Sequence, residues 1–312
     1  EGPVVIDEPY EDSQILMILQ KRKQHDIHMA KSIHKAVEYY QSCGTTSVQD
    51  NTWDPEVYRY LSQMIRGIDI TSWAKGEDPE SVSSITHGSA ASENISTGPL
   101  KFFLDGAFYN KTAWLSEPYN NTENWYGQGL PSADIIKRIE PFIAHKKQCI
   151  FHAEGDRAIS ELCTALENLL PLYPWIPELR TRIEHAQLIN DTDYERIRNL
   201  GMVISVQPGA CSNPERDISI LGEGRANEAY PHKKIIEEGI PLAFGSDFPY
   251  EEIIDPFEGL NMVTRRTLGE SLELEEALKV YTEGSAYADF SENRKGRIEP
   301  GFQADFFITS EN

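Results

Sequence analysis

Residues 148–188 read QCIFHAEGDRAISELCTALENLLPLYPWIPELRTRIEHAQL, and this stretch decides the fold. An apolar run ends at His152, a helix-like segment follows, and a second apolar run ends at His185. A strand, a helix and another strand at this spacing predict a parallel sheet with right-handed crossovers. Because the alternation continues on both sides of this stretch, we expect an α/β fold.

Seven runs have the composition of strands, at 45–50, 68–73, 99–105, 148–152, 181–185, 202–207 and 241–246. Helices are expected between them, and a long helix from about residue 13 to residue 42 precedes Gly44, a plausible C-cap. A chain of 312 residues can hold one TIM-like (β/α)8 barrel of roughly 250 residues. Such a barrel needs eight strands, so we expect it to be incomplete. The polar residues 74–99 are predicted to form a surface insertion.

The composition excludes several classes of partner. The net charge of −21, from 50 acidic and 29 basic residues, would repel a nucleic acid. No apolar run reaches the length that crosses a membrane. The four cysteines, Cys43, Cys149, Cys163 and Cys211, show no C-x-x-C spacing, so we expect reduced thiols and a cytoplasmic location.

Four side chains that could bind a metal lie on or just after predicted strands: Lys101, His152, His185 and Asp247. A barrel brings the carboxyl ends of its strands to one mouth, and neighbouring strands lie about 4.8 Å apart. Imidazole is a preferred ligand of zinc, so two histidines that end successive strands favour a metal site over a structural role.

The other two candidates are weaker on chemistry alone. Asp247 lies among Gly245, Ser246 and Pro249, which equally suit a turn. The ammonium group of Lys101 repels a metal unless carbon dioxide converts the amine to a carbamate. An ion pair of Lys101 with Asp105 or another carboxylate of the mouth is therefore the favoured interpretation before any family is considered.

From about residue 44 to residue 308 the chain resembles the amidohydrolase superfamily. The resemblance is to the amidohydrolase family 3 branch of metal-dependent hydrolases and N-substituted formamide deformylases. The motifs that carry it are KFFLDGAF (101–108), SEPY (116–119), HAEGDRAI (152–159), RIEHAQL (182–188), SVQP (205–208), YPHKKIIEEGIPLAFGSDFP (230–249) and KGRIEPGFQADFFI (295–308).

The resemblance implies a divalent metal cofactor, expected to be zinc. It implies that His152 and His185 bind a second metal and that a carboxylated Lys101 bridges two metals. Asp247 would bind the first metal and act as general base. The expected partner is a small-molecule amide, with no nucleic acid and no membrane, and a homodimer stays open.

A second set of residues is expected around the substrate. The resemblance suggests substrate contacts or support of the metal ligands for Asp156, Arg157, Arg182 and Gln207. Ion pairing among Asp156, Arg157 and Arg182 would explain the first three equally well. Loops 107–128 and 208–230 are predicted to shape the pocket, and the second loop carries Arg216, Arg225 and Tyr230.

One motif of the family is missing. In the family, the first barrel strand ends in H-x-H. This chain has eight histidines, and no two of them are spaced in that way (25, 28, 34, 87, 145, 152, 185 and 232). We therefore interpret the chain as an N-terminally truncated member without barrel strand 1. The expected parts are a helical lead-in (1–44), barrel strands 2 to 8 (45–291) and a C-terminal strand segment of a small β-sandwich (292–312).

This interpretation leads to two functional hypotheses. In the first, the full-length parent is an amidohydrolase that binds one or two ions and cleaves a non-peptide C–N amide bond. This chain alone would then be weakly active or inactive, with Lys101 uncarboxylated and at most one ion weakly held. The alternative is a non-catalytic regulatory or binding protein on the same fold. A barrel hydrolase of esters or phosphoesters is a third possibility.

Overall fold

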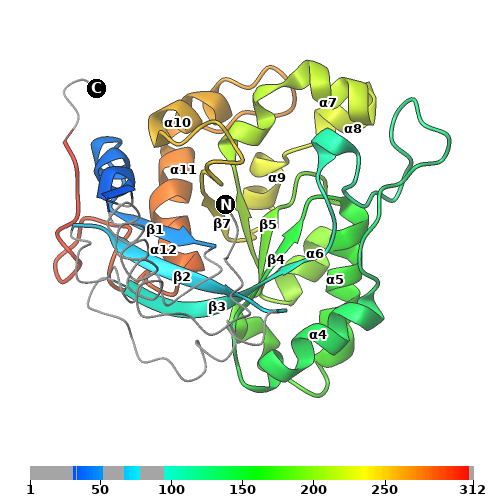
Figure 1. Ribbon diagram of the computed structural model, residues 1–312, viewed down its shortest axis with the longest axis horizontal. Coiled ribbons are helices and arrows are strands. Elements are labelled where there is room, and N and C mark those ends of the chain that lie inside the picture. The colour runs from blue at the N-terminus through cyan, green and yellow to red at the C-terminus, as the bar shows by residue number, and fades with distance from the viewer. Residues whose placement is uncertain (1–30, 33, 52–66, 78–94, 309–312) are drawn as a thin grey trace, which may run out of the picture.

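A computed structural model describes residues 31–32, 34–51, 67–77 and 95–308. Seven parallel strands form one sheet in chain order. They are β1 (Ser47–Asp50), β2 (Asp69–Lys75), β3 (Ile95–Phe103), β4 (Cys149–Ala153), β5 (Arg182–His185), β6 (Val203–Val206) and β7 (Leu242–Phe244). The sheet curls as part of a TIM-like barrel, with helices on its outer side (Figure 1). The expected α/β fold and the seven strands are confirmed.

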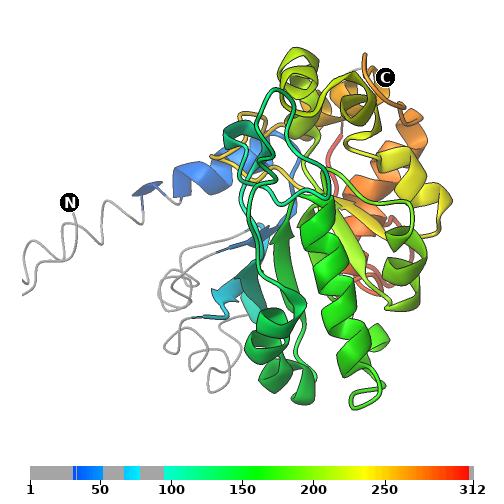
Figure 2. The same cartoon turned by 90° about the vertical axis from the view of Figure 1, so that its right-hand side faces the viewer.

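Helices connect the strands from β3 to β7 and also follow β7, and they cover the outer face of the sheet. They are α4 (Ser132–Ala144), α5 (Asp156–Leu169), α6 (Asp193–Asn199), α9 (His232–Glu237), α10 (Pro256–Thr264), α11 (Leu274–Lys279) and α12 (Ser285–Ala288). Helices α4 and α5 run beside each other along the outer side of the sheet (Figure 2). No helix within the described ranges is both long and apolar enough to cross a membrane.

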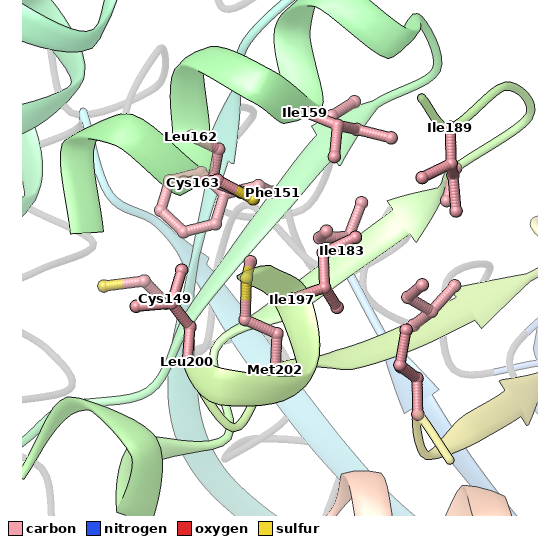
Figure 3. Packing of buried hydrophobic residues seen from close by; sticks show 14 of the residues in the cluster. Cys149, Phe151, Ile159, Leu162, Cys163, Ile183, Ile189, Ile197, Leu200 and Met202 are labelled. Atoms are coloured by element: carbon pink, nitrogen blue, oxygen red, sulfur yellow. The ribbon is translucent and has the colours of Figure 1, made fainter. Parts of the chain in front are cut away.

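The two-residue period of the strands separates a hydrophobic outer face from a polar interior. In β4, Cys149 and Phe151 pack in the core beneath α5 and α6 (Figure 3). His152 lies between core residues Phe151 and Ala153 and therefore faces the other side. Each large aliphatic or phenylalanine side chain that is fully buried in this core stabilises the fold by about 1.5–3 kcal/mol. The same packing fixes the direction in which the intervening polar residues point.

The insertion predicted at 74–99 is too long at both ends. Strand β2 continues to Lys75, and β3 begins at Ile95, where it pairs with Ile70. The β-branched residues Ile95 and Thr97 favour a strand, although the surrounding Ser- and Gly-rich composition predicted a loop. Residues 78–94, most of the predicted helix from residue 13 and most of the helix expected between the first two strands lie outside the described residues.

The loop predicted at 208–230 contains two short helices, α7 (Pro214–Leu221) and α8 (Glu223–Glu228), after a 3-10 turn, η3 (Pro208–Ser212). Asn213 caps α7 by accepting a hydrogen bond from the backbone of Arg216. Residues of this segment and of 107–128 share a separate hydrophobic cluster that includes Tyr119, Leu221 and Tyr230. We call these two segments together the mouth lobe.

The chain after α11 continues through a π-helical turn, η4 (Val280–Gly284), into α12. Residues 292–308 are described and contain no strand, so the predicted strand of a β-sandwich is not confirmed. The predicted domain boundaries at residues 44 and 291 stay predictions.

Candidate metal centre

His152 and His185 lie side by side at the carboxyl ends of β4 and β5. Their ring centroids are 4.4 Å apart, with the rings edge to face. Potential ligand atoms of His152, His185 and Glu154 all lie within 4.8 Å of one another. The structure therefore brings the two predicted histidines together and adds a carboxylate to them.

Glu154 is the residue that sequence reasoning missed. It is 6% exposed, and its Oε2 accepts a hydrogen bond of 2.7 Å from the backbone N–H of Phe108. Burial and the neighbouring Asp105 raise its pKa well above the ordinary value. Glu154 follows His152 by two residues, so the strand period that places the histidine at the mouth could also have pointed to this carboxylate.

The two histidines each have one ring nitrogen already committed. Nδ1 of His185 lies 2.7 Å from Oε1 of Gln207, and Nε2 of His152 lies 2.9 Å from the carbonyl oxygen of Gly106. Because both partners are acceptors, these nitrogens carry the protons, and the other nitrogen of each ring can bind a metal. Burial, followed by the charge of Lys101, lowers the pKa of His185 to about 3. Burial and His185 lower the pKa of His152 well below its usual range, so both rings are neutral, as metal ligands must be.

Lys101 lies in β3, 4% exposed, and faces the barrel interior. Its Nζ is 5.8 Å from the ring centroid of Trp73 and 5.3 Å from that of Phe103. Burial lowers its pKa to about 8, Glu184 acts in the opposite direction, and Arg182 lowers it further. A buried amine with a lowered pKa is more often neutral, which is the form that reacts with carbon dioxide.

The predicted ion pair between Lys101 and Asp105 is wrong. The buried carboxylate of Asp105 instead accepts hydrogen bonds from the backbone N–H groups of Trp114, Glu154 and Gly155. This carboxylate fixes the chain that follows β4 and so positions Glu154. Burial raises the pKa of Asp105 to about 7 against the effect of those hydrogen bonds.

Asp247 follows β7 at the exposed mouth. Its carbonyl accepts a hydrogen bond from the N–H of Tyr250, so the residue also has the turn role that the sequence suggested. Removal of its carboxyl from water raises its pKa to about 6, Lys101 lowers the pKa, and Glu184 raises it. Asp247 (φ 51°) and His185 (φ 78°) both adopt the left-handed region. This is uncommon without glycine, and such strain concentrates at functional sites.

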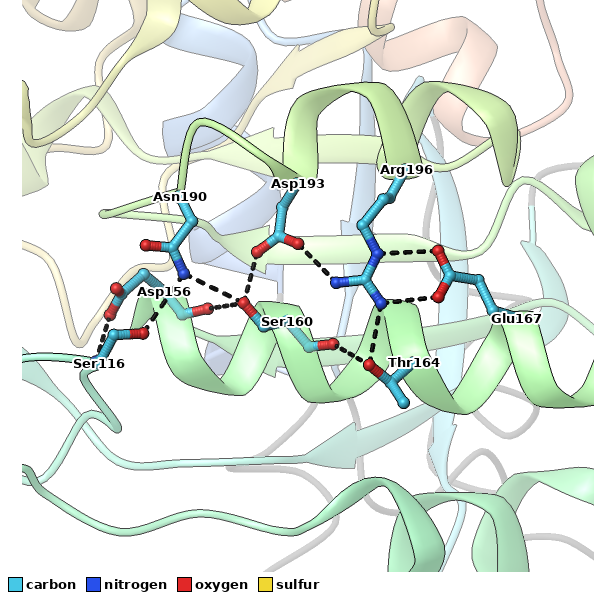
Figure 4. Close-up of polar contacts among 8 residues, drawn as sticks. All are labelled: Ser116, Asp156, Ser160, Thr164, Glu167, Asn190, Asp193 and Arg196. Atoms are coloured by element: carbon cyan, nitrogen blue, oxygen red, sulfur yellow. Dashed lines mark hydrogen bonds and ion pairs between the residues drawn. The ribbon is translucent and has the colours of Figure 1, made fainter.

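Three of the residues predicted around the substrate do not pair with one another. Asp156 accepts from the N–H of Ser116 at 2.9 Å, Arg157 bonds to Glu161 at 2.7 Å, and Arg182 bonds to Glu184 at 2.5 Å. Figure 4 shows Asp156 at one end of a polar network between α5 and α6 that also contains Ser116, Ser160, Asn190, Asp193 and Arg196. Ion pairing among Asp156, Arg157 and Arg182, the alternative explanation of these residues, is therefore not found.

The three polar residues predicted to line the pocket hold the mouth lobe together. Arg225 donates to the carbonyls of Glu117 and Pro118, which joins the two segments of the lobe. Arg216 pairs with Asp217 at 2.9 Å, and the buried hydroxyl of Tyr230 lies 3.3 Å from the same carboxylate. Their donors are thus engaged within the protein.

The chain is thus a partial parallel α/β barrel with imidazole and carboxylate groups at the carboxyl ends of its strands, the end at which barrel enzymes place their active sites. Residues 12–312 match the model of the amidohydrolase family. The chain belongs to that family.

Known proteins agree with this assignment. A protein of Bacillus subtilis (strain 168), provisionally named amidohydrolase YtcJ, is 31% identical over 229 residues, which are 69% of this chain and 42% of that protein. Protein LONG AFTER FAR-RED 3 of Arabidopsis thaliana is 29% identical over 256 residues, 78% of this chain and 43% of that protein. The crystal structure of an uncharacterized metal-dependent hydrolase from Pyrococcus furiosus superposes with a TM-score of 0.79 and 27% identity, and the match covers 90% of this chain and 59% of that one. The chain thus spans about half the length of these relatives.

Proposed function

We propose that this chain supplies the distal part of the metal site of a hydrolase that cleaves a non-peptide C–N amide bond in a small molecule. The observation that carries the proposal is the convergence of two neutral histidines and Glu154 at the mouth of a partial barrel. Membership of the amidohydrolase family supports the hydrolytic class.

The donor set fits a divalent metal ion, and zinc is the ion that we favour. Two imidazoles and one carboxylate, each buried or nearly so, match the ligands that zinc prefers. His152, His185 and Glu154 would hold one ion, and Lys101 as a carbamate and Asp247 would extend the site toward a second. The ion would supply Lewis acidity that polarises the amide carbonyl and acidifies water.

The residues of the chain would perform the proton transfers and the positioning. The carboxylate of Asp247 would accept a proton from the attacking water and deliver it to the leaving nitrogen. A pKa of about 6 suits this role, because the group is ionised at neutral pH yet basic enough to hold a proton. Oε1 of Gln207 would keep the imidazole of His185 oriented through its Nδ1–H.

The chain contains no H-x-H pair, so we propose that it binds at most one ion, weakly, and turns over little or no amide. Zinc binding by the purified chain, measured by calorimetry, tests this proposal. His185→Ala should abolish binding. His34→Ala, at an exposed histidine paired with Glu38, should leave binding unchanged.

Two results would contradict different parts of the proposal. If wild-type protein and His185→Ala bind zinc equally, the metal site is wrong. If the chain holds two ions tightly and hydrolyses an N-formyl amine, the site is right, but the expected inactivity is wrong.

A further inference from the structure

A cavity of 360 Å³ lies at the end of the barrel opposite the candidate metal centre. Its floor includes Pro241 and Leu242, at the amino end of β7, whereas Asp247 follows the carboxyl end of the same strand. Its walls come from η4, from α12 and from the chain that follows α12. We call it the base cavity. Because the strands are parallel, it is separate from the histidine cluster at the mouth.

One wall of the base cavity belongs to a loop that packs tightly on η4 and α12. Gly296 has a φ of 95°, and a Cβ atom added there would lie 2.9 Å from Cβ of Ala286 and 3.0 Å from the carbonyl oxygen of Thr282. This close approach fixes the two neighbours of Gly296 in the wall, Lys295 and Arg297. The cavity is therefore built by defined contacts between the loop and the two helical turns.

Most of the surface that lines the base cavity is apolar. Leu242 and the ring of Tyr287 contribute to it, and the guanidinium of Arg180 lies 3.7 Å from the centroid of that ring. Arg180 therefore holds Tyr287 in place from one side. Small-molecule sites have volumes of about 300–1,000 Å³ and mainly apolar linings with a few polar groups. The base cavity fits the lower end of that range, so it suits a ligand with about one aromatic ring.

Four charged side chains also line the base cavity, and the protein neutralises three of them. The three ion pairs are Glu292 with Arg180 at 2.6 Å, Lys295 with Asp289 at 3.2 Å and Arg297 with Glu299 at 3.6 Å. Both basic side chains of the lining thus already have a carboxylate partner. An anionic ligand would have to compete with these partners.

Glu283 is the fourth charged side chain of the lining, and it has no cation within ion-pair distance among the described residues. Lys279, one turn earlier in the chain, pairs with Glu275 at 2.9 Å instead. The net charge of −21 adds a field that attracts cations. The base cavity therefore combines an apolar floor with one negative charge that the protein does not neutralise.

We propose that the base cavity binds a small organic ammonium ion, an amine whose apolar body is about the size of one aromatic ring. The ammonium group pairs with the carboxylate of Glu283, and the apolar body covers Leu242 and Tyr287. This site goes beyond the proposed function, because it lies at the other end of the barrel and requires neither a metal nor hydrolysis.

The test uses the metal-free chain with 13C-labelled leucine methyl groups. The methyl resonances of Leu242, assigned from Leu242→Ile, are followed by NMR during titration with 2-phenylethylamine, which is protonated at neutral pH. They should move saturably, with a Kd on the order of 1 mM for a ligand of this size. The neutral analogue 2-phenylethanol should bind about three- to fivefold more weakly, because it lacks the ion pair. The anion 3-phenylpropionate should bind more weakly than the alcohol.

A pair of glutamate variants separates the local charge from the charge of the whole chain. Glu283→Gln keeps the size of an exposed side chain and should weaken the binding of 2-phenylethylamine by about three- to fivefold, with the binding of 2-phenylethanol unchanged. Glu258→Gln is the matched control. It changes the net charge equally at an exposed glutamate of α10, outside the cavity lining, and should bind the amine as the wild type does.

Three results would overturn the inference: no shift of the Leu242 resonances with the amine, binding of 3-phenylpropionate as tight as that of the amine, or equal affinities of Glu283→Gln and Glu258→Gln for the amine. The proposed metal site is judged separately, by zinc binding and its loss in His185→Ala. A chain that binds zinc but not the amine would refute the base cavity alone, and the reverse result would refute the metal site alone.

Discussion

The orientation of a single imidazole depends on Gln207. Its Oε1 accepts from Nδ1–H of His185, and this hydrogen bond directs the opposite nitrogen toward His152 and Glu154. The backbone of His185 is in the left-handed region, a conformation that is strained for any residue except glycine. The hydrogen bond to Gln207 is therefore important for holding the ring in place. A ligand on strained backbone needs a fixed ring to stay in place.

We predict that Gln207→Leu lowers the zinc affinity of the chain by about 10- to 100-fold, the usual effect of losing the partner of a metal-binding histidine. Leucine has a similar size and cannot accept a hydrogen bond from Nδ1–H. Gln128→Leu, at an exposed glutamine of the mouth lobe, is the control and should bind zinc normally. Equal affinities of the two variants, measured by calorimetry, would show that Gln207 does not orient the ring.

Part of the candidate site could be predicted because the sequence pattern indicates where strands end. The apolar runs before His152 and His185 predict that both lie at one edge of a parallel sheet, and the structure confirms that placement. Contacts made through loops could not be predicted. Asp105 binds three backbone N–H groups of residues 114, 154 and 155, and no local pattern announces a carboxylate used in this way.

At the scale of elements, the turn η4 lies unusually close to β7. A Cβ atom added at Gly284 would lie 2.0 Å from the carbonyl oxygen of Leu242. The backbone of Gly284 is helical, with φ near −63°, so the glycine is required by this close approach and not by its conformation. The packing of β7 against η4 therefore depends on the absence of a side chain at Gly284.

We predict that Gly284→Ala lowers the free energy of unfolding by about 1–3 kcal/mol, because η4 must move away from β7. Gly224→Ala is the control, since a Cβ there meets nothing within 4 Å inside α8. Alanine in that helix should be neutral or stabilise by up to about 1 kcal/mol. Urea denaturation measures both. A Gly284→Ala variant as stable as Gly224→Ala would contradict the close approach.

The strands were predictable to within a few residues because their apolar residues are contiguous. The helices α7 and α8 were not, since each has fewer than three turns and Gly222 lies between them with a φ of 81°. Their stability comes from packing against residues 107–128 in the shared cluster, a contact that joins segments far apart in the sequence. Tertiary packing of this kind leaves no periodic signal in one short segment.

At the scale of the whole molecule, the chain is acidic and two of its carboxyl groups, those of Asp105 and Glu154, are buried near the candidate metal centre. The net charge is −21, and burial raises the pKa of Asp105 to about 7 and that of Glu154 well above its usual range. Three buried histidines have the opposite shift, and burial lowers the pKa of His185 and His232 to about 3. The dependence of stability on pH therefore reflects two opposing contributions, one from the buried carboxyls and one from the buried histidines.

The two sets act in different pH ranges. A histidine with a lowered pKa stabilises the fold above its unfolded value of about 6.5, and this stability is lost as the pH falls toward 3. A carboxyl with a raised pKa stabilises the fold below its unfolded value of about 4, and this stability is lost as the pH rises through the folded value. Between pH 4 and 6.5 the sets offset each other. Above pH 6.5 the histidines no longer contribute, and the stability lost by the carboxyls is offset in part by Lys101, whose pKa is lowered to about 8.

We predict that the free energy of unfolding of the metal-free chain falls between pH 6 and pH 8. Ionisation of Asp105, with a pKa of about 7, should account for about 1 kcal/mol of that loss. Asp105→Asn cannot ionise, so its stability, although lower throughout because an acceptor is lost, should fall less steeply over this range. Asp305→Asn, at an exposed aspartate, should keep the wild-type slope.

Urea denaturation at several pH values measures these slopes. If the Asp105→Asn slope equals that of the wild type, Asp105 is already ionised at pH 6, and its three backbone hydrogen bonds outweigh its burial. If the wild-type slope is opposite in sign, the buried histidines dominate at neutral pH. In the expected case, the buried carboxylates Asp105 and Glu154 destabilise the metal-free fold above pH 6.5, so an ion that neutralises Glu154 should restore part of the stability in that range.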